Sequence, residues 1–168
     1  MLNGGKKMKI SKKRRMQNKT DYNKRLHLLK GEIPRLVLRK TNKYLIAQYV
    51  ESKEAQDKVL IGINSKELIK HGWPKERSGS LKSLPAAYLT GFLFGKKIEK
   101  SKLKIPILDL GMARTVHGSR LYAFAKGVVD AGVKISHDSK VFPKDERIHG
   151  KHTKEIPFKE VKSKIEGK

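Results

Sequence analysis

The sequence PRLVLRKTNKYLIAQYV, residues 34–50, predicts how the chain begins to fold. After Pro34, the residues Arg35, Val37 and Arg39 alternate with Leu36 and Leu38, which is the period of two that is typical of a strand. The polar pair Thr41-Asn42 predicts a tip, and residues 44–50 predict a returning strand. We therefore expect a β-hairpin here.

The segments after the hairpin predict a mixed α/β fold. A third strand, KVLIGIN at 58–64, completes an antiparallel meander. Residues 65–80 have the composition of a loop with one helical turn. A helix is expected from Ser83 to about Lys100, a buried strand over 104–110, and a second helix over 120–131 that ends at Gly132. This order implies crossover connections on a mixed sheet that is covered by helices.

The first predicted helix contains a G-x-x-x-G pair, Gly91 and Gly95. Such a pair forms a dimer face in membrane helices, but Lys96 and Lys97 follow it and the apolar run is short. We expect the two glycines to allow close packing of the helix against the sheet.

Three regions follow from these patterns. Residues 34–135 are expected to form the core domain, and 136–168 a polar C-terminal tail with a short helix near 155–165. Residues 1–33 form a basic N-terminal arm. Its first 19 residues are expected to be disordered, and Thr20 is expected to cap a helix over 21–30 that Gly31 ends.

The charge is unbalanced and concentrated in the arm. The chain has 40 Lys and Arg against 16 Asp and Glu, a net charge of +24, and residues 1–43 alone contain 15 basic side chains and two acidic ones. Self-repulsion of this size is tolerable when a polyanion neutralises it, and nucleic acid is the expected partner. A membrane surface is less favoured because the basic stretch lacks an apolar face. Without cysteine, disulfides and thiolate metal sites are excluded.

Three groups of side chains are candidates for RNA binding. Arginine makes bidentate phosphate contacts, and aromatic side chains stack on bases. Tyr22 has an equally plausible role in docking the short helix. The N-terminus of the second helix could hold a phosphate through free backbone N–H groups. The candidates are, in the arm, Lys12, Lys13, Arg14, Arg15, Lys19, Tyr22 and Arg25; in the hairpin, Arg35, Arg39, Lys40, Thr41, Asn42, Lys43 and Tyr44; and at the helix entry, Arg114, His117, Gly118, Ser119 and Arg120.

Catalytic patterns are weak by comparison. A basic RNA-processing nuclease is the enzymatic alternative, but two-metal chemistry needs clustered carboxylates, and the first strand has none. Asp109 is expected to serve as a cap or as a partner of Arg114, and not in catalysis. His149 and His152 lack the further ligands that a zinc site requires. We predict no catalytic residue, metal, cofactor, small-molecule substrate or membrane partner. A nonspecific RNA chaperone is the non-enzymatic alternative.

Three long stretches resemble a known family. They are KTDYNKRLHLLKGEIPRLVLRKTNKYLIAQ, LPAAYLTGFLFGKKI and LDLGMARTVHGSRLYAFAKGVVDAGVKISHDSKVFPKDERIHGKH. In the same order, over roughly residues 9–152, they are similar to the archaeal form of large-subunit ribosomal protein L-eighteen, whose eukaryotic counterpart is numbered L-five. The bacterial form has arginine directly after its H-G pair, whereas here Ser119 precedes Arg120.

The resemblance implies a fold and a set of partners. It implies a three-layer α/β/α arrangement with a mixed sheet, similar to the ribonuclease-H-like fold but without nuclease activity. The implied partners are 5S rRNA, adjacent large-subunit rRNA and neighbouring ribosomal proteins of the central protuberance, in the cytoplasm. It also implies RNA contacts at 12–15, 19, 25, 35, 39–43 and 117–120.

Overall fold

A four-stranded mixed sheet organises the molecule, for which a computed structural model describes residues 10–54, 56–150 and 156–167. The strands are β1 (Arg35–Lys40), β2 (Leu45–Lys53), β3 (Gln56–Asn64) and β4 (Ile107–Asp109), in the spatial order β3-β2-β1-β4. The first three pair antiparallel, and β4 pairs parallel with β1. The predicted meander and mixed sheet are therefore confirmed.

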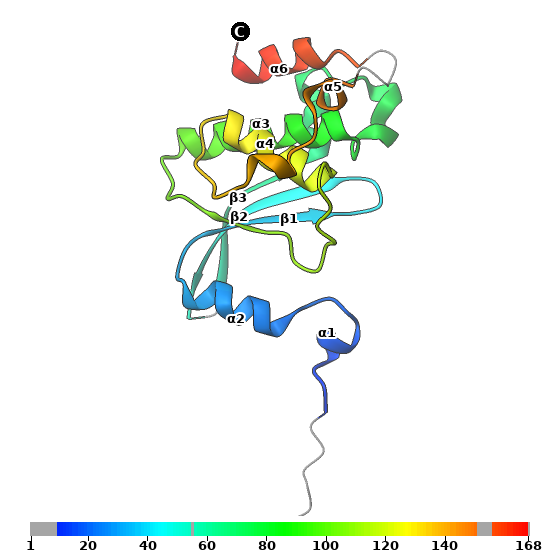
Figure 1. Ribbon diagram of the computed structural model, residues 1–168. Helices are drawn as coiled ribbons and strands as arrows, with labels where there is room; N and C mark the ends of the chain where they lie inside the picture. Colours follow the sequence, from blue (N-terminus) through cyan, green and yellow to red (C-terminus); the bar gives the residue numbers. More distant parts are fainter. Residues whose placement is uncertain (1–9, 55, 151–155, 168) are drawn as a thin grey trace, which may run out of the picture.

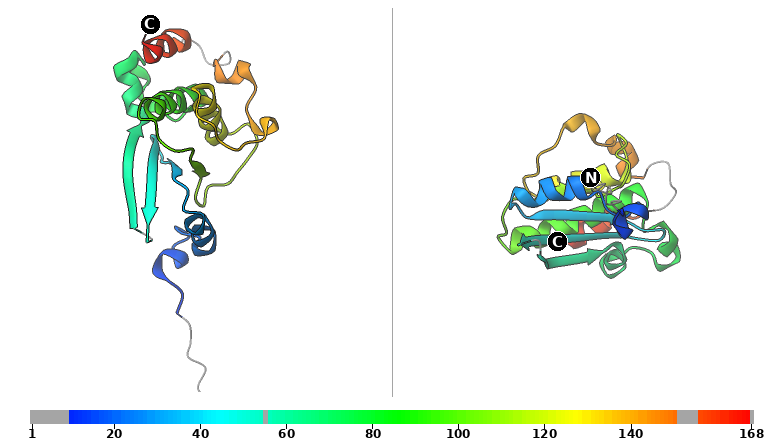
Figure 2. Two further views of the ribbon diagram at one scale, coloured as in Figure 1. Left: turned by 90° about the vertical axis from the view of Figure 1, so that its left-hand side faces the viewer. Right: turned by 90° about the horizontal axis from the view of Figure 1, so that it is seen from below.

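Nine helical elements are described around the sheet. The α-helices are α1 (Lys13–Met16), α2 (Tyr22–Lys30), α3 (Leu84–Lys100), α4 (Arg120–Asp130), α5 (Asp145–Ile148) and α6 (Phe158–Glu166). The 3₁₀ helices are η1 (Ser65–His71), η2 (Lys75–Ser80) and η3 (Ser139–Val141). Figures 1 and 2 show α3 and α4 on one side of the sheet and α2 on the other. Since α2 buries none of its residues, this second side is only partly covered.

The alternation along β1 separates the two faces of the sheet. Leu36 and Leu38 are fully buried in the core with Ala47 and Tyr49, their partners across the β1–β2 pair. Arg35 and Arg39 point to the opposite face, where both guanidinium groups contact Asp109. One strand therefore supplies the core and also places two arginines beneath α2.

The fourth strand differs from its prediction. A buried strand was expected over 104–110, but β4 spans only residues 107–109, and Ile107 is 36% exposed. The reason is its position at the edge of the sheet, where β1 is its only neighbour.

The glycines of α3 pack against another helix, and the predicted contact with the sheet is wrong. A Cβ atom on Gly91 would lie 2.1 Å from the Phe124 carbonyl oxygen, and one on Gly95 would lie 2.5 Å from the Ala131 side chain. Gly127 of α4 approaches the Tyr88 carbonyl oxygen in the same way. In the described ranges, no helix is long and apolar enough to cross a membrane.

Two other regions are more ordered than the sequence predicts. The expected loop at 65–80 forms η1 and η2 and buries Leu68 and Trp73. The expected tail contributes Ile148, Phe158 and Val161 to the core. The order of these two segments was not predicted because each one is mostly polar and buries only a few apolar side chains.

Candidate nucleic-acid interface

The described part of the N-terminal arm is more ordered than expected. Residues 13–16 form the short helix α1, although disorder was predicted through residue 19. Two local contacts join this turn to the start of α2. The Arg14 guanidinium donates to the Thr20 hydroxyl at 2.9 Å, and the Lys12 ammonium lies 4.3 Å from the centre of the Tyr22 ring. Residues 1–9 lie outside the described part of the chain.

The ends of α2 also differ from the prediction. Asp21, and not Thr20, caps the helix, because its carboxylate accepts hydrogen bonds from the backbone N–H groups of Asn23 and Lys24. Thr20 is instead the partner of Arg14. Gly31 has right-handed backbone angles, and the left-handed residue is Glu32, with φ of 49°.

An ionic cluster lies between α2 and the sheet. Asp109 accepts from the Arg35 guanidinium at 3.1 Å and from that of Arg39 at 3.4 Å, so the predicted partner Arg114 is wrong. Arg35 also binds Asp57 at 2.8 Å. Because Arg35 is 3% exposed and occupied by two carboxylates, its predicted role as an RNA contact does not fit the structure.

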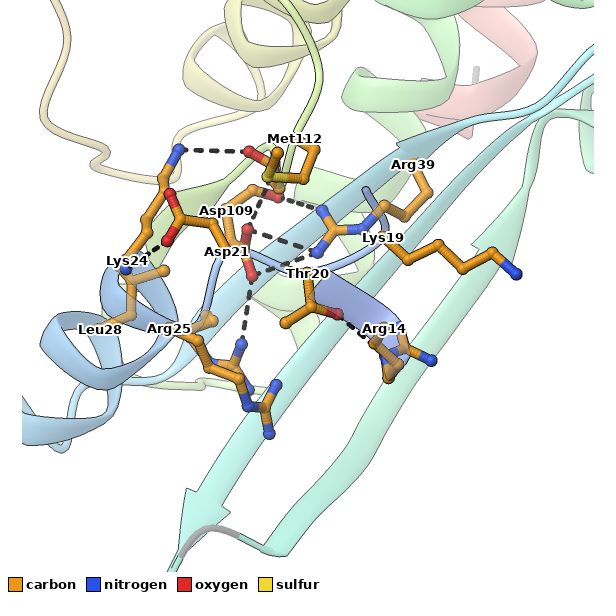
Figure 3. Close-up of a pocket in the computed structure, with 12 residues that line it drawn as sticks. Arg14, Lys19, Thr20, Asp21, Lys24, Arg25, Leu28, Arg39, Asp109 and Met112 are labelled. Carbon is orange, nitrogen blue, oxygen red and sulfur yellow. Dashed lines mark hydrogen bonds and ion pairs between the residues drawn. The ribbon is translucent and has the colours of Figure 1, made fainter. Parts of the chain in front are cut away.

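A pocket of about 130 Å³ opens between the arm and this cluster. Figure 3 shows the Arg39 side chain directed at Asp109, while Arg14, Lys19 and Thr20 border the pocket from the arm. The Lys24 ammonium reaches the backbone oxygen of Gly111 at 3.3 Å. The pocket therefore has a basic rim. The buried carboxylate in it is that of Asp109, and arginines already bind both of its oxygens.

The hairpin tip presents basic and polar side chains to solvent. Lys40, Thr41, Asn42 and Lys43 are exposed, as the sequence predicts for a contact surface. The turn is closed by the Thr41 hydroxyl, which donates to the Tyr44 carbonyl oxygen at 2.8 Å and accepts from the Tyr44 N–H group. The Lys66 ammonium lies 4.5 Å from the centre of the half-buried Tyr44 ring.

The N-terminus of α4 forms a second basic hollow, of about 430 Å³. Ser119 stands at the N-cap, and its hydroxyl makes no capping hydrogen bond. Gly118 precedes it with φ of 67°, a left-handed conformation that glycine adopts without strain. Ser119, Arg120 and Leu121 at this end of α4 line the hollow, and the start of a helix is an arrangement that binds anions.

Besides the buried Arg35, the structure brings nine of the nineteen predicted residues into two groups. Arg14, Lys19, Arg25 and Arg39 line the pocket beneath the arm. Lys40, Arg114, Gly118, Ser119 and Arg120 line the hollow at α4. Arg39 and Lys40 are consecutive at the end of β1, and since successive side chains of a strand point to opposite faces, the two groups lie on different sides of this strand end. His117 is exposed but does not line the hollow.

One basic residue of the hollow was missed by the sequence analysis. Arg147 of α5 lines it together with Arg114 and Arg120. Arg147 lies in the segment that was predicted to be a tail, and no spacing in the sequence links it to α4. The folding of that segment onto α3 is what brings it here.

No group of three or more His, Asp or Glu side chains that could hold a metal ion occurs within residues 10–54, 56–150 and 156–167. His149 packs on the Phe158 ring at 4.8 Å, and its predicted companion His152 lies outside the described residues.

Comparison with known proteins decides the family. Residues 6–106 match the family of "Ribosomal large subunit proteins 60S L5, and 50S L18". The chain belongs to this ribosomal protein family. Its members are structural components of the ribosome and not enzymes. Membership of the family therefore argues against the alternative of an RNA-processing nuclease.

Relatives match beyond the family region. The large ribosomal subunit protein uL18 of Korarchaeum cryptofilum is 46% identical over 144 residues, which cover 86% of this chain and 72% of that protein. The uL18 protein of Methanococcoides burtonii is 41% identical, with coverage of 96% and 95%. That of Methanoregula boonei is 38% identical, with coverage of 85% and 80%. The resemblance to the archaeal form is confirmed.

Proposed function

We propose that this ribosomal protein binds 5S rRNA and adjacent large-subunit rRNA, and that it helps to anchor 5S rRNA in the central protuberance with neighbouring ribosomal proteins. The observation that carries the proposal is the set of exposed cations in the arm, at the hairpin tip and at the entry of α4. A net charge of +24 favours a polyanionic partner, and a folded RNA has both the charge and the shape for this role.

The mechanism combines charge neutralisation with recognition of shape. Exposed Lys12, Lys13 and Arg15 of the arm neutralise phosphates and release counterions. The hollow at α4 takes one phosphate through helix N–H groups and the Arg114, Arg120 and Arg147 side chains. The hairpin tip offers Asn42 and Lys43 to 2′-hydroxyl groups or splayed bases.

We also infer that the core has the ribonuclease-H-like fold. The support is the order of the strands, an antiparallel meander β1–β3 followed by β4 parallel to β1 on its other side. α3 and α4 cover one face, and α2 forms a thin layer over the other. In this chain Asp109 at the end of β4 binds two arginines, so this sheet carries a structural ion cluster.

A competition experiment tests the proposed function. Labelled 5S rRNA bound to the full chain is challenged with unlabelled 5S rRNA or with a scrambled RNA of the same length, at physiological salt. We expect only 5S rRNA to compete well. Equal competition would contradict the proposal and favour the nonspecific RNA chaperone.

The role of the arm has its own test. If the arm contacts Z phosphates, log K falls with log salt concentration with a slope of about −0.7Z to −0.9Z from these contacts. Removal of residues 1–19 is expected to weaken 5S rRNA binding and to flatten the slope. An unchanged slope would show that the arm does not neutralise phosphates.

A further inference from the structure

The apolar side of α2 is only partly buried, through the half-buried Tyr22, Leu28 and Leu29. The helix has nine residues, buries none of them fully, and leaves Leu26 51% exposed. A helix of this length is marginal in water unless tertiary contacts stabilise it. Polar contacts therefore add to this incomplete apolar contact in holding α2 on the sheet.

Two adjacent side chains make these contacts. The Lys24 ammonium donates to the Gly111 carbonyl oxygen at 3.3 Å. The Arg25 guanidinium binds Asp57 of β3 at 2.9 Å. Both side chains of the Arg25–Asp57 pair are about one-third exposed, at 35% and 33%.

The sheet holds Asp57 in a fixed orientation. Its Oδ1 atom accepts from the Ser52 hydroxyl at 2.7 Å and from Arg35 at 2.8 Å, which leaves Oδ2 for Arg25. Arg35 is itself fixed by Asp109, which also accepts from the Gly111 N–H group at 2.8 Å. The two attachment points of α2 are thus joined through one partly buried network.

We propose that Asp57 is a positioning residue for RNA binding, which holds α2 and the attached arm on the sheet through Arg25. This inference rests on the proposed RNA-binding function and changes the role of Arg25. The sequence predicts Arg25 as a phosphate contact, whereas its guanidinium is here the anchor of the helix. An arm held in place loses less conformational freedom when RNA binds, and the affinity rises accordingly.

The proposal predicts a change in RNA affinity opposite to the one expected from charge alone. Replacing an acid in a basic RNA-binding protein should strengthen RNA binding, because it removes a repulsive charge. If Asp57 positions the arm, the Asp57→Asn variant should bind 5S rRNA more weakly. This substitution is selective, because the amide oxygen can still accept from Ser52 and Arg35 while the amide N–H₂ group faces Arg25 as a second donor.

The first experiment compares Asp57→Asn with Glu76→Gln. Glu76 is an exposed residue of η2 that lies outside the network, so this control removes the same charge. We expect 5S rRNA binding to be about fivefold weaker for Asp57→Asn, the upper range for a partly exposed ion pair. Glu76→Gln should bind unchanged or slightly more tightly. Equal affinities of the two variants would overturn the proposal.

A double-mutant cycle with Arg25→Gln separates positioning from loss of stability. Arg25 lies on an exposed helix, so its substitution leaves the core intact. If Asp57 acts through Arg25, Asp57→Asn should cause no further loss of affinity in the Arg25→Gln background. A full additional loss would show that Asp57 acts through Arg35 and the core instead.

Two further measurements give independent readouts. An anchor does not change the number of phosphates bound, so Arg25→Gln should leave the salt slope of binding unchanged. A slope smaller by about 0.7–0.9 would identify Arg25 as a direct phosphate contact and contradict the proposal. Hydrogen exchange in the free protein should be faster at the amides of 22–30 in Asp57→Asn than in Glu76→Gln.

The exchange measurement also distinguishes two kinds of failure. If the unmodified chain does not prefer 5S rRNA over scrambled RNA, the proposed function fails, but faster exchange in α2 would still support the anchor. If 5S rRNA is preferred and both variants match in affinity and exchange, the function stands and the anchor is refuted.

Discussion

Asp109 determines which of two predicted RNA-binding arginines remains available to a ligand. Its side chain is 6% exposed, and a carboxylate buried to this extent needs compensating charge and hydrogen bonds. Arg35 supplies these from within the sheet, and its buried guanidinium is then not available to a ligand. The Arg39 side chain remains 45% exposed and can still face a ligand. Two arginines four residues apart on one strand therefore have different roles.

Asp57 gives a prediction about pH. Burial raises the pKa of Asp57, but hydrogen bonds from Ser52 and Arg25 and the charge of Arg35 outweigh this, so its pKa lies below the usual value. A lowered pKa in the folded state adds stability above the unfolded pKa of about 3.9, and this stability is lost as the pH falls through the folded pKa.

The unfolding free energy of the unmodified chain should therefore exceed that of Asp57→Asn at pH 7, and the difference should shrink below about pH 4. Urea unfolding at pH 7, 5 and 3 measures it. A difference that grows as the pH falls would mean that the Asp57 carboxylate is not stabilised in the fold.

Gly91 gives a prediction about packing. A methyl group there would meet the backbone oxygen of Phe124 at 2.1 Å, and backbone cannot move aside as a flexible side chain can. We expect Gly91→Ala to lower the unfolding free energy by about 3 kcal/mol, at the upper end for overpacking. Gly79→Ala is the matched control, since nothing lies within 4 Å of its added methyl group. Equal urea midpoints for the two variants would refute the close contact of α3 and α4.

The elements that follow simple periods were predictable from the sequence. β1 shows its alternation directly, and α3 begins where the helix from Ser83 was expected. The sequence could not show which element Gly91 and Gly95 contact, because a small-residue stripe fits a sheet or a helix equally well. The position of Arg147 was also hidden, since it depends on the path of a polar segment across the core.

The C-terminal helix α6 was predicted from its helical period, but its contribution to the core was not predicted. The Phe158 ring lies 5.6 Å from that of Tyr88, and Val161 is fully buried. The Lys162 ammonium lies 5.1 Å from the centre of the Phe92 ring. These contacts make α6 a cover for α3.

Truncation of Phe158 tests this role of α6. Phe158→Ala is expected to reduce the unfolding free energy by about 3 kcal/mol, the lower end for a buried phenylalanine that leaves a cavity. The neighbouring exposed residue supplies the control, Lys159→Ala, with an expected change within about 0.5 kcal/mol. Thermal and urea unfolding measure both. A loss below about 1 kcal/mol for Phe158→Ala would show that α6 contributes little to the core.

The whole molecule combines a compact apolar core with a surface of one dominant sign. The core lies between the sheet and the helices α3 and α4, and α6 adds to it by packing on α3. The excess of basic side chains is outside it, and self-repulsion among them destabilises the free protein. Salt screens this repulsion, but salt also weakens the attraction to RNA phosphates. The free and bound forms should therefore respond to salt in opposite directions.

Thermal unfolding at increasing salt concentration tests this difference. Between about 0.05 and 0.5 M KCl, the Tm of the free protein should rise as repulsion is screened. With 5S rRNA at a free concentration of 100 Kd in low salt, binding adds about 2.7 kcal/mol, or about 5–10 °C in Tm. This increment should fall as salt raises Kd. A free-protein Tm that falls with salt would mean that attractive ion pairs, such as those of Asp57 and Asp109, outweigh the repulsion among the other cations.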